Sequence, residues 1–309
     1  MIVADFRYSS EGFSNQSKIN PDLSTSSTVI VNKASKSICG LPVMILGSLP
    51  AEGGGLIFEE AEMLDIVKKH PESKQYFKKF IGSGELMKGF TRYCLWLTED
   101  DFEFSKSIPE FNKRFEIVKN YREQSAKKQT QHLANFPFLF AERRFFAKNA
   151  LVIPITTSER RPYIPICYVD NDTVIYHSSC AVYDAEKWLF ALLTSKMHNL
   201  WVRAVGGSLE TRIRYSATLC YNTFPFPKLT TAQKEELDSL AQNILNIRDE
   251  NFDMTLGEMY NPETMPEELR EAHHQLDLAV EHIYRTEPFT SDEERLEHLF
   301  KLYAKMTKK

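Results

Sequence analysis

The sequence predicts an α+β protein, in which a mixed α/β region with a small sheet is followed by an all-α helical region. Two observations support this fold class. Short apolar runs at 92–97, 150–156 and 163–169 are typical of buried strands, and helical segments separate them. After Pro227 the pattern changes to long stretches with apolar residues three and four apart, as in amphipathic helices.

The mixed region begins with about 35 residues rich in Ser, Thr and Asn, which predict an irregular lead ending in a strand at 29–31. Apolar residues at helical spacing predict two helices within 59–81, divided by Pro71. The remaining elements that we expect are a basic helix at 109–132, a strand and turn at 173–183, and one long apolar helix at 184–205.

Residues 229–309 predict three amphipathic helices. The first starts at a Thr cap and places Leu237, Ala241 and Ile244 on one stripe. The second covers 265–285, and the third opens with a Ser and a Glu at capping-box spacing.

Composition narrows the class of protein. With 309 residues, 42% of them hydrophobic, the chain can form real cores. It contains no run of 18 apolar residues and no apolar leader, so we expect a soluble cytoplasmic protein. The five cysteines include no C-x-x-C pair, which predicts core thiols rather than a disulfide framework or zinc ribbon.

Charge is distributed unevenly. Residues 229–309 hold 9 basic and 18 acidic side chains, whereas residues 66–161 hold 19 basic and 11 acidic ones. This is typical of a basic face for a polyanion beside an acidic helical region. Long solvated helices can also segregate charge by chance, so charge alone leaves both interpretations open.

Enzyme motifs fail. The sequence has no phosphate loop, dinucleotide loop, H-E-x-x-H or G-x-S-x-G. Glu72-Ser73-Lys74 offers groups used by metal-dependent nucleases, but such triplets arise by chance in so charged a chain, and we interpret it as a solvated helix face. His273, His274 and His282 lack a fourth ligand and are expected to be solvated or packed between helices.

The segment 222–226, Asn-Thr-Phe-Pro-Phe, partly matches the Asn-Pro-Pro-aromatic loop with which amino-methyltransferases hold a flipped base. That chemistry needs the Asn and the Pro adjacent, and here two residues intervene. A structural role is therefore expected.

Basic side chains cluster along the chain, several of them among aromatic residues, as phosphate-contacting surfaces often do. Ordinary solubility lysines explain the first cluster equally well. The residues that we expect to contact DNA phosphates are Lys78, Lys79, Lys88, Arg122, Lys127, Lys128, Arg143, Arg144, Arg160 and Arg161.

The segment 206–216 opens with two glycines, which would let the backbone approach a partner closely, and then presents Glu210, Arg212 and Arg214 two residues apart. On an extended segment these side chains point the same way. A carboxylate can accept from cytosine N4 while a guanidinium donates to guanine O6 and N7 of the same base pair. The pattern therefore indicates base reading, with a surface ion pair in a hairpin as the alternative.

Five stretches resemble the C-terminal part of the MmeI-like family, type IIL single-chain restriction-modification enzymes. They follow the family's order over roughly residues 19–305 and read INPDLSTSSTVIV…SICGLPVMILGSLPAEGGGLIF, FIGSGELMKGFTRYCLWL, ITTSERRPYIPI, LLTSKMHNLWVRAVGGSLETRIRYSATLCYNTFPFP and MPEELREAHHQLDLAVEHIY. The resemblance implies a DNA target recognition domain at 19–228 and a C-terminal helical domain at 229–309, with 1–18 as the end of a missing catalytic domain.

The resemblance also implies roles for residues. In the family, the acidic and basic pair that falls here on Glu210 and Arg212 reads the base pair beside the methylated adenine. Arg214 follows in the same element, and His177 and Ser178 lie near further base-reading positions. The family's glycine-arginine dipeptide is Gly207-Ser208 here, so the phosphate contact of that arginine is lost or moved.

The family's nuclease and its S-adenosylmethionine-binding adenine-N6 methyltransferase domain have no counterpart in this sequence. The resemblance therefore implies that the chain binds double-stranded DNA, holds no cofactor and is not catalytic alone. Its other partner would be a methyltransferase catalytic domain, in the same parent polypeptide or in a separate subunit. The alternatives are a stand-alone specificity subunit with an exposed apolar patch near its N-terminus, or an enzyme that uses Glu72, Lys74 and His177.

Overall fold

The computed structural model describes residues 29–209 and 211–308. Its N-terminal lobe, residues 50–145, is built on a four-stranded sheet of order β2-β4-β3-β8, in which β8 comes from later in the chain and pairs parallel with β3. These strands are β2 (Ile57–Glu59), β3 (Phe77–Ile81), β4 (Arg92–Leu95) and β8 (Thr173–Ile175).

The core of this lobe is aromatic. The rings of Phe58 and Phe77 meet edge-on at 5.2 Å, and Phe102 stacks on Phe138 at 4.0 Å. The helical elements of the lobe are α1 (Glu60–Lys69), η1 (Pro71–Tyr76), α2 (Ser83–Lys88), α3 (Phe102–Ser105), α4 (Pro109–Glu123), α5 (Lys128–His132) and η2 (Leu133–Asn135).

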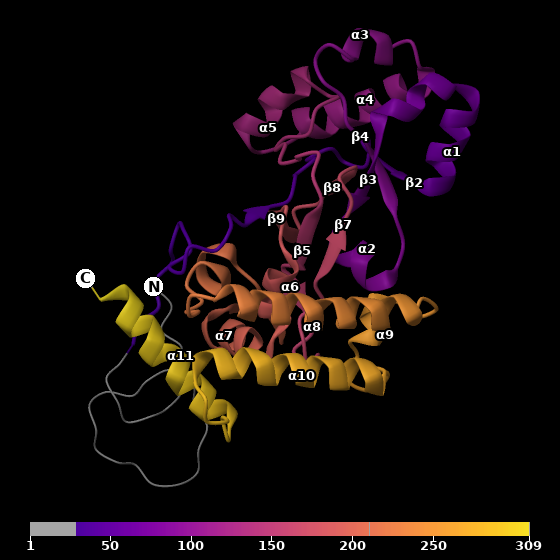
Figure 1. Ribbon diagram of the computed structural model, residues 1–309. Helices are drawn as coiled ribbons and strands as arrows, with labels where there is room; N and C mark the ends of the chain where they lie inside the picture. Colours follow the sequence, from indigo (N-terminus) through magenta and orange to yellow (C-terminus); the bar gives the residue numbers. More distant parts are fainter. Residues whose placement is uncertain (1–28, 210, 309) are drawn as a thin grey trace.

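A second, antiparallel sheet of order β1-β9-β5-β7 lies between this lobe and the C-terminal helices (Figure 1). Strand β5 is buried throughout because Leu151 and Ile153 pack into the large core while Ala150 and Val152 pack into a smaller cluster. The strands are β1 (Ile45–Leu46), β5 (Ala150–Pro154), β7 (Cys167–Val169) and β9 (Ser179–Tyr183).

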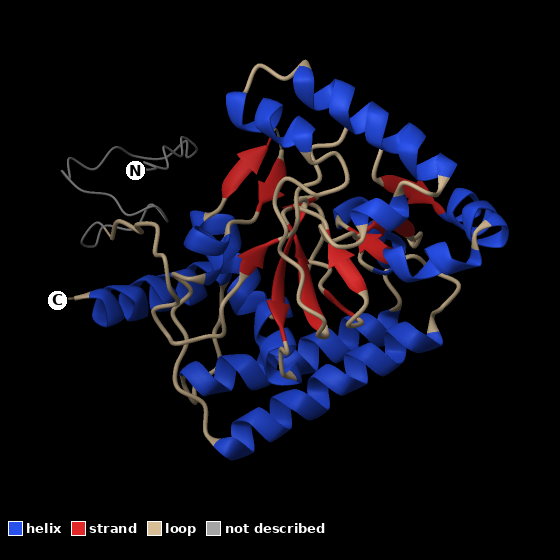
Figure 2. Cartoon of the chain, turned by 90° about the horizontal axis from the view of Figure 1, so that it is seen from above, coloured by secondary structure: helices blue, strands red, loops and turns tan. Residues whose placement is uncertain are grey.

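The remaining strands form a small sheet of order β10-β11-β6, comprising β6 (Thr156–Thr157), β10 (Gly207–Leu209) and β11 (Arg212–Arg214). In Figure 1 the long helices α8 and α10 lie side by side below the β1-β9-β5-β7 sheet. Figure 2 shows the strands enclosed by helices. The C-terminal helical elements are α6 (Lys187–Thr194), α7 (Lys196–Val205), η3 (Ala217–Tyr221), α8 (Thr231–Glu250), α9 (Leu256–Met259), α10 (Glu267–Tyr284) and α11 (Asp292–Thr307).

One large core joins the mixed region to the C-terminal helices. It runs from Met44 to Tyr303, and Trp201 of α7 packs against the rings of Phe300 and Tyr303 on α11. Helix α2 packs on α9 so closely that a Cβ at Gly257 would lie 2.5 Å from the carbonyl oxygen of Met87. The C-terminal helices and the mixed region therefore share one hydrophobic core.

The α+β fold class is confirmed, and so are the three C-terminal helices. Thr230 and Ser291 cap α8 and α11 by accepting hydrogen bonds from the amides of Gln233 and Glu294, both at 3.2 Å. The cysteines are free thiols, and three of them are buried. Within the described ranges, no helix combines the length and apolarity that crossing a membrane requires.

Four expected elements were wrong. Residues 29–31 are irregular, although Val29 and Val31 pack on the large core. Residues 77–81 form a strand because pairing with β4 and β8 overrides the local helical spacing. The expected helices at 109–132 and 184–205 are each divided in two, the second at Ser195, whose extended backbone ends α6 and whose hydroxyl caps α7.

Candidate nucleic-acid interface

Strands β10 and β11 form an antiparallel hairpin in which Leu209 stands opposite Arg212 and Gly207 opposite Arg214. Its second strand also pairs with β6, where Arg214 faces Thr156. Ile213 is half-buried against the large core, whereas Arg212 and Arg214 are exposed on the other face of β11. The hairpin therefore presents two guanidinium groups outward from a supported strand.

The expectation that three charged residues share one extended segment needs correction. The chain reverses direction between Leu209 and Arg212, so the spacing of two applies only to Arg212 and Arg214. Glu210 lies outside the described residues.

The two glycines at the start of this segment differ. A Cβ at Gly206 would lie 2.4 Å from the carbonyl oxygen of Val202, so packing at the end of α7 requires glycine there. A Cβ at Gly207 would meet nothing closer than the Cβ of Arg214 at 3.9 Å. Gly206 is thus explained by internal packing, without a partner.

His177 and Ser178 lie in the tight turn between β8 and β9, where the Ser179 amide donates to the Tyr176 carbonyl at 2.9 Å. The His177 ring is half-buried and meets the Tyr176 ring edge-on at 4.3 Å. Burial lowers the pKa of His177, Glu142 raises it and Arg144 lowers it further. Its ring is therefore neutral near pH 7, with one nitrogen able to donate and one to accept.

The structure brings this turn next to the hairpin. The Ser178 carbonyl accepts from the Ile155 amide at 3.0 Å, and the Ile155 carbonyl accepts from the Tyr215 amide at 2.7 Å. Ile155 thus lies between the turn and the residue that follows β11. The predicted base-reading residues that the structure describes therefore come from adjoining segments.

The predicted phosphate-contacting residues differ in their exposure to solvent and in the groups that they contact. Two belong to one aromatic cluster: Arg143 lies 4.0 Å from the Trp96 ring centroid and Lys78 lies 5.1 Å from that of Phe145, whose ring packs edge-on against Trp96. The exposed members of the set are Lys88, Lys127, Lys128, Arg143 and Arg160.

Several of these cations already have acidic partners. Lys78 pairs with Asp172 at 2.5 Å and Lys79 with Asp170 at 2.6 Å, across the loop between β7 and β8. Arg144 pairs with Glu142 and also donates to the Gly47 carbonyl, and Arg160 pairs with Glu263 near α9. Arg161 is half-buried, and its carbonyl accepts a hydrogen bond from Arg203. Exposed ion pairs are weak, so such cations can still exchange partners for phosphates.

Arg122 was wrongly expected to contact phosphate. It is fully buried at the end of α4, because the loops around η2 fold over it. Its guanidinium donates hydrogen bonds of 2.6–3.0 Å to the backbone carbonyls of Ala51, Leu133, Phe136, Pro50 and Leu139. Arg122 therefore holds the loops of the N-terminal lobe together.

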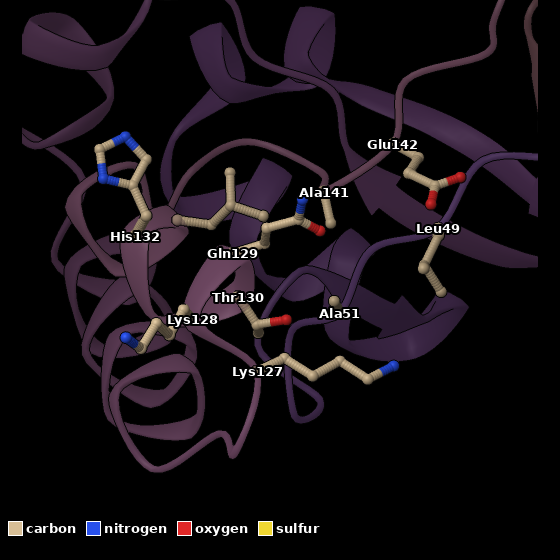
Figure 3. A pocket seen from close by; sticks show the side chains of 10 residues that line it. Leu49, Ala51, Lys127, Lys128, Gln129, Thr130, His132, Ala141 and Glu142 are labelled. Atoms are coloured by element: carbon tan, nitrogen blue, oxygen red, sulfur yellow. The ribbon is translucent and has the colours of Figure 1, made fainter.

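A pocket lies beside α5 (Figure 3). In this view the ammonium groups of Lys127 and Lys128 point in opposite directions, and Glu142 lies at the upper right, on the side toward which Lys127 points. The pocket therefore does not gather its cations around one anion. Its lining residues are Leu49, Ala51, Lys127, Lys128, Gln129, Thr130, His132, Leu133, Ala141 and Glu142.

The candidates for an unrecognised catalytic site lie on separate elements. Glu72 and Lys74 are exposed on η1, and Glu72 lies 3.7 Å from His70, whereas His177 lies in the turn after β8. His273 is buried and hydrogen-bonded to Tyr260 at 2.7 Å. Among the described residues, no three His, Cys, Asp or Glu side chains gather as a metal ion would need.

The segment 222–226 has a structural role, as expected. The side chain of Asn222 donates to the Ala34 carbonyl at 2.9 Å, and the hydroxyl of Thr223 accepts from the Trp201 indole at 3.1 Å. Phe224 and Phe226 are buried in the large core. The polar groups that would hold a flipped base are therefore engaged inside the protein.

Comparison with known proteins agrees with this arrangement. The chain matches the family "MmeI, target recognition domain" over residues 25–228 and "MmeI, C-terminal domain" over residues 229–309. It is 46% identical over 293 residues to DNA methyltransferase A of Bacillus subtilis (strain 168), covering 95% of this chain and 33% of that protein.

The chain is also similar to a solved structure, that of the type IIL restriction-modification enzyme MmeI in complex with DNA. The TM-score is 0.89 at 36% identity, and the match covers 94% of this chain and 39% of that one. The chain thus spans well under half the length of either relative.

The mixed α/β region and the helical region packed on it correspond to the two matched family models, a target recognition domain followed by a C-terminal domain. The chain belongs to the MmeI family, with that family's target recognition domain at 25–228 and its C-terminal domain at 229–309. The resemblance drawn from the sequence is confirmed.

Proposed function

We propose that this chain is the DNA specificity portion of an adenine-N6 methyltransferase of the fused restriction-modification kind. The observation that carries the proposal is the outward placement of Arg212 and Arg214 beside the turn that holds His177 and Ser178. The match to the MmeI target recognition domain supports it. Exposed cations of the N-terminal lobe would fix the register on phosphates while these side chains read base edges in the major groove.

Each reading residue has a chemistry that suits a base edge. Glu210 would accept from cytosine N4 and Arg212 would donate to guanine O6 and N7 of the same pair. Arg214 and the hydroxyl of Ser178 can contact neighbouring bases. The ring of His177 can contact a base only through Nε2, which donates or accepts according to the tautomer, because Nδ1 is buried.

Methyl transfer would take place in another part of a longer polypeptide. That part would bind S-adenosylmethionine and hold the flipped adenine, and in some relatives a nuclease domain would accompany it. This chain's own residues do not fit the base-holding loop, because the closest match, 222–226, is engaged in the core. The length of the relatives supports this division of labour.

A second candidate is a stand-alone specificity subunit that pairs with a separate methylase. One observation favours it: Ile30, Val43 and Leu46, close to the start of the described chain, are exposed large apolar residues. Such residues are suited to contact with a catalytic domain. The reading frame upstream of the gene distinguishes a fused partner from a separate one.

Binding of duplex DNA by this chain tests the proposal. Fluorescence anisotropy should show non-specific binding with a Kd of roughly 10⁻⁴–10⁻⁶ M at physiological salt, weakening as salt rises. Replacing exposed Lys128 by Ala should lower the salt slope by about 1, whereas Lys301→Ala on the acidic α11 should leave it unchanged. Binding that is absent even at low ionic strength contradicts the DNA assignment, and calorimetric binding of S-adenosylmethionine at micromolar level would favour the enzyme alternative.

A further inference from the structure

We infer that Gly82 and Ser83, at the start of α2, are positioning residues that set the base preference of the turn holding His177 and Ser178. The inference rests on the proposed function, since it requires that this turn reads DNA. The inference goes beyond the proposed function because it assigns specificity to residues that act through the turn and do not themselves contact DNA.

Ser83 forms hydrogen bonds with two atoms of Ser178. The Ser83 amide donates to the hydroxyl oxygen of Ser178 at 3.0 Å, and the Ser83 hydroxyl donates to the Ser178 carbonyl at 2.5 Å. The Ser83 hydroxyl also lies 3.2 Å from that of Ser179. These contacts fix both the backbone and the side-chain rotamer of Ser178, because two separate atoms of the residue are held.

Gly82 makes this approach possible. A Cβ there would lie 2.3 Å from the hydroxyl oxygen of Ser178 and 3.0 Å from a ring carbon of Tyr176. A side chain at this position must therefore displace the Ser178 hydroxyl from the place where the Ser83 amide donates to it. The backbone at Gly82 is extended, with φ −131°, so close contact rather than conformation demands glycine here.

A buried ion pair holds the start of α2 in place. Glu85 is 5% exposed, and its carboxylate accepts from the Gly82 amide at 2.8 Å and from the Arg92 guanidinium at 2.5 Å. Arg92 belongs to β4 of the N-terminal lobe. The end of α2 that touches the turn is thus anchored to the sheet and has little freedom to adjust.

The other side of the turn is held by the segment around β1. The His177 amide donates to the Ser48 carbonyl at 3.0 Å, and the Ser48 amide donates to the Ile175 carbonyl at 2.7 Å. A Cβ at Gly47 would lie 2.3 Å from the Tyr176 carbonyl oxygen. The turn is therefore held by hydrogen bonds to the start of α2 on one side and to the segment around β1 on the other. Removing the bonds on one side should let the turn move relative to the hairpin.

Such movement should alter recognition, because a reading group must be held within about 0.5 Å of its productive position. Ser83→Ala removes the bond to the Ser178 carbonyl but keeps the amide donor, so the fold should survive. Gly82→Ala displaces the Ser178 hydroxyl directly. The matched control is Ser105→Ala in the N-terminal lobe, a buried serine whose hydroxyl donates to the Phe102 carbonyl at 2.7 Å.

The experiment places this chain in the corresponding segment of the Bacillus relative and maps methylated sites by sequencing. Ser83→Ala and Gly82→Ala should lower discrimination at one base-pair position by about fivefold or more, with the other positions unchanged. Ser105→Ala should leave every position unchanged. Thermal unfolding of each variant reports whether the loss of discrimination follows loss of stability.

The outcomes are separable. If Ser83→Ala and Gly82→Ala lower total methylation without changing any base preference, the two residues are only structural and the inference is wrong, while the proposed function stands. If His177→Ala and Arg212→Ala also leave every preference unchanged, the proposed base readers themselves are wrong. If only the reader variants and the two α2 variants change preference, the inference is supported.

Discussion

The hydroxyl of Tyr163 donates a hydrogen bond to the carboxylate of Asp277 on α10, with 2.7 Å between the two oxygens. This contact joins the target recognition domain to the C-terminal domain. Asp277 also accepts from the Lys196 amide at 2.6 Å, and the Tyr163 ring stacks on buried His273. Burial raises the pKa of Asp277 to about 7, and the nearby Glu281 adds to the rise.

Asp277 should make stability depend on pH. Its pKa in the folded state lies above the unfolded value near 4, so the folded state binds more protons between these values. The stabilisation is therefore present at low pH and declines as pH rises from about 4 to about 7, by at most about 1.4 kcal/mol per pH unit.

Asp277→Asn stays neutral at every pH and keeps an acceptor for the Lys196 amide. Relative to the unmodified chain, its free energy of unfolding should therefore rise between about pH 4 and pH 7 and stay level above that. Urea unfolding measures this difference, in which the opposing effect of the buried histidines cancels. The exposed Asp249→Asn is the control, and parallel stability curves for the Asp277 variant and the unmodified chain would show the prediction to be wrong.

Arg122 should matter for stability rather than for DNA. An ammonium group has three donors where the guanidinium serves five carbonyls, so Arg122→Lys leaves buried acceptors unpaired. We expect a loss of about 1–3 kcal/mol in urea unfolding for each carbonyl left unpaired. The exposed Lys128→Ala should change stability by less than about 0.5 kcal/mol. Equal stability of the two variants would contradict the burial argument.

The glycine pair before the hairpin offers a matched comparison. Gly206→Ala forces a Cβ against the Val202 carbonyl and should destabilise the chain by about 1–3 kcal/mol. Gly207→Ala meets only the Cβ of Arg214 at van der Waals distance and should stay within about 0.5 kcal/mol of the unmodified chain. Thermal unfolding of both variants measures the difference, and a more damaging Gly207→Ala would reverse the assignment.

Sequence reasoning succeeded where the signal is local. Helices α8 and α11 were predictable because their apolar stripes repeat along the chain and Thr230 and Ser291 mark their starts. It failed where distant segments decide. Residues 77–81 carry a helical spacing, yet β4 and β8 supply partners that make them a strand.

The candidate site shows the same limit. Arg122 and Lys128 look equivalent in the sequence, since charge carries no record of burial, but loops from 50–51 and 133–139 close over Arg122 alone. The contribution of Ser83 was also missed, because 95 residues separate it from Ser178. A Gly-Ser-Gly-Glu stretch was the available signal, and it resembles an ordinary helix start.

The central claim is that the segment 206–216 reads a base pair, and exchanging its charges tests this most directly. Glu210→Lys combined with Arg212→Asp reverses the order of donor and acceptor, whereas each single change leaves an unpaired group that costs about 1–3 kcal/mol of discrimination. The measurement is the mapping of methylated sites for this chain joined to the catalytic part of its Bacillus relative. A change from C·G to G·C at one position, beside the methylated adenine, is the predicted result. An unchanged base at that position would show that Glu210 and Arg212 do not read DNA.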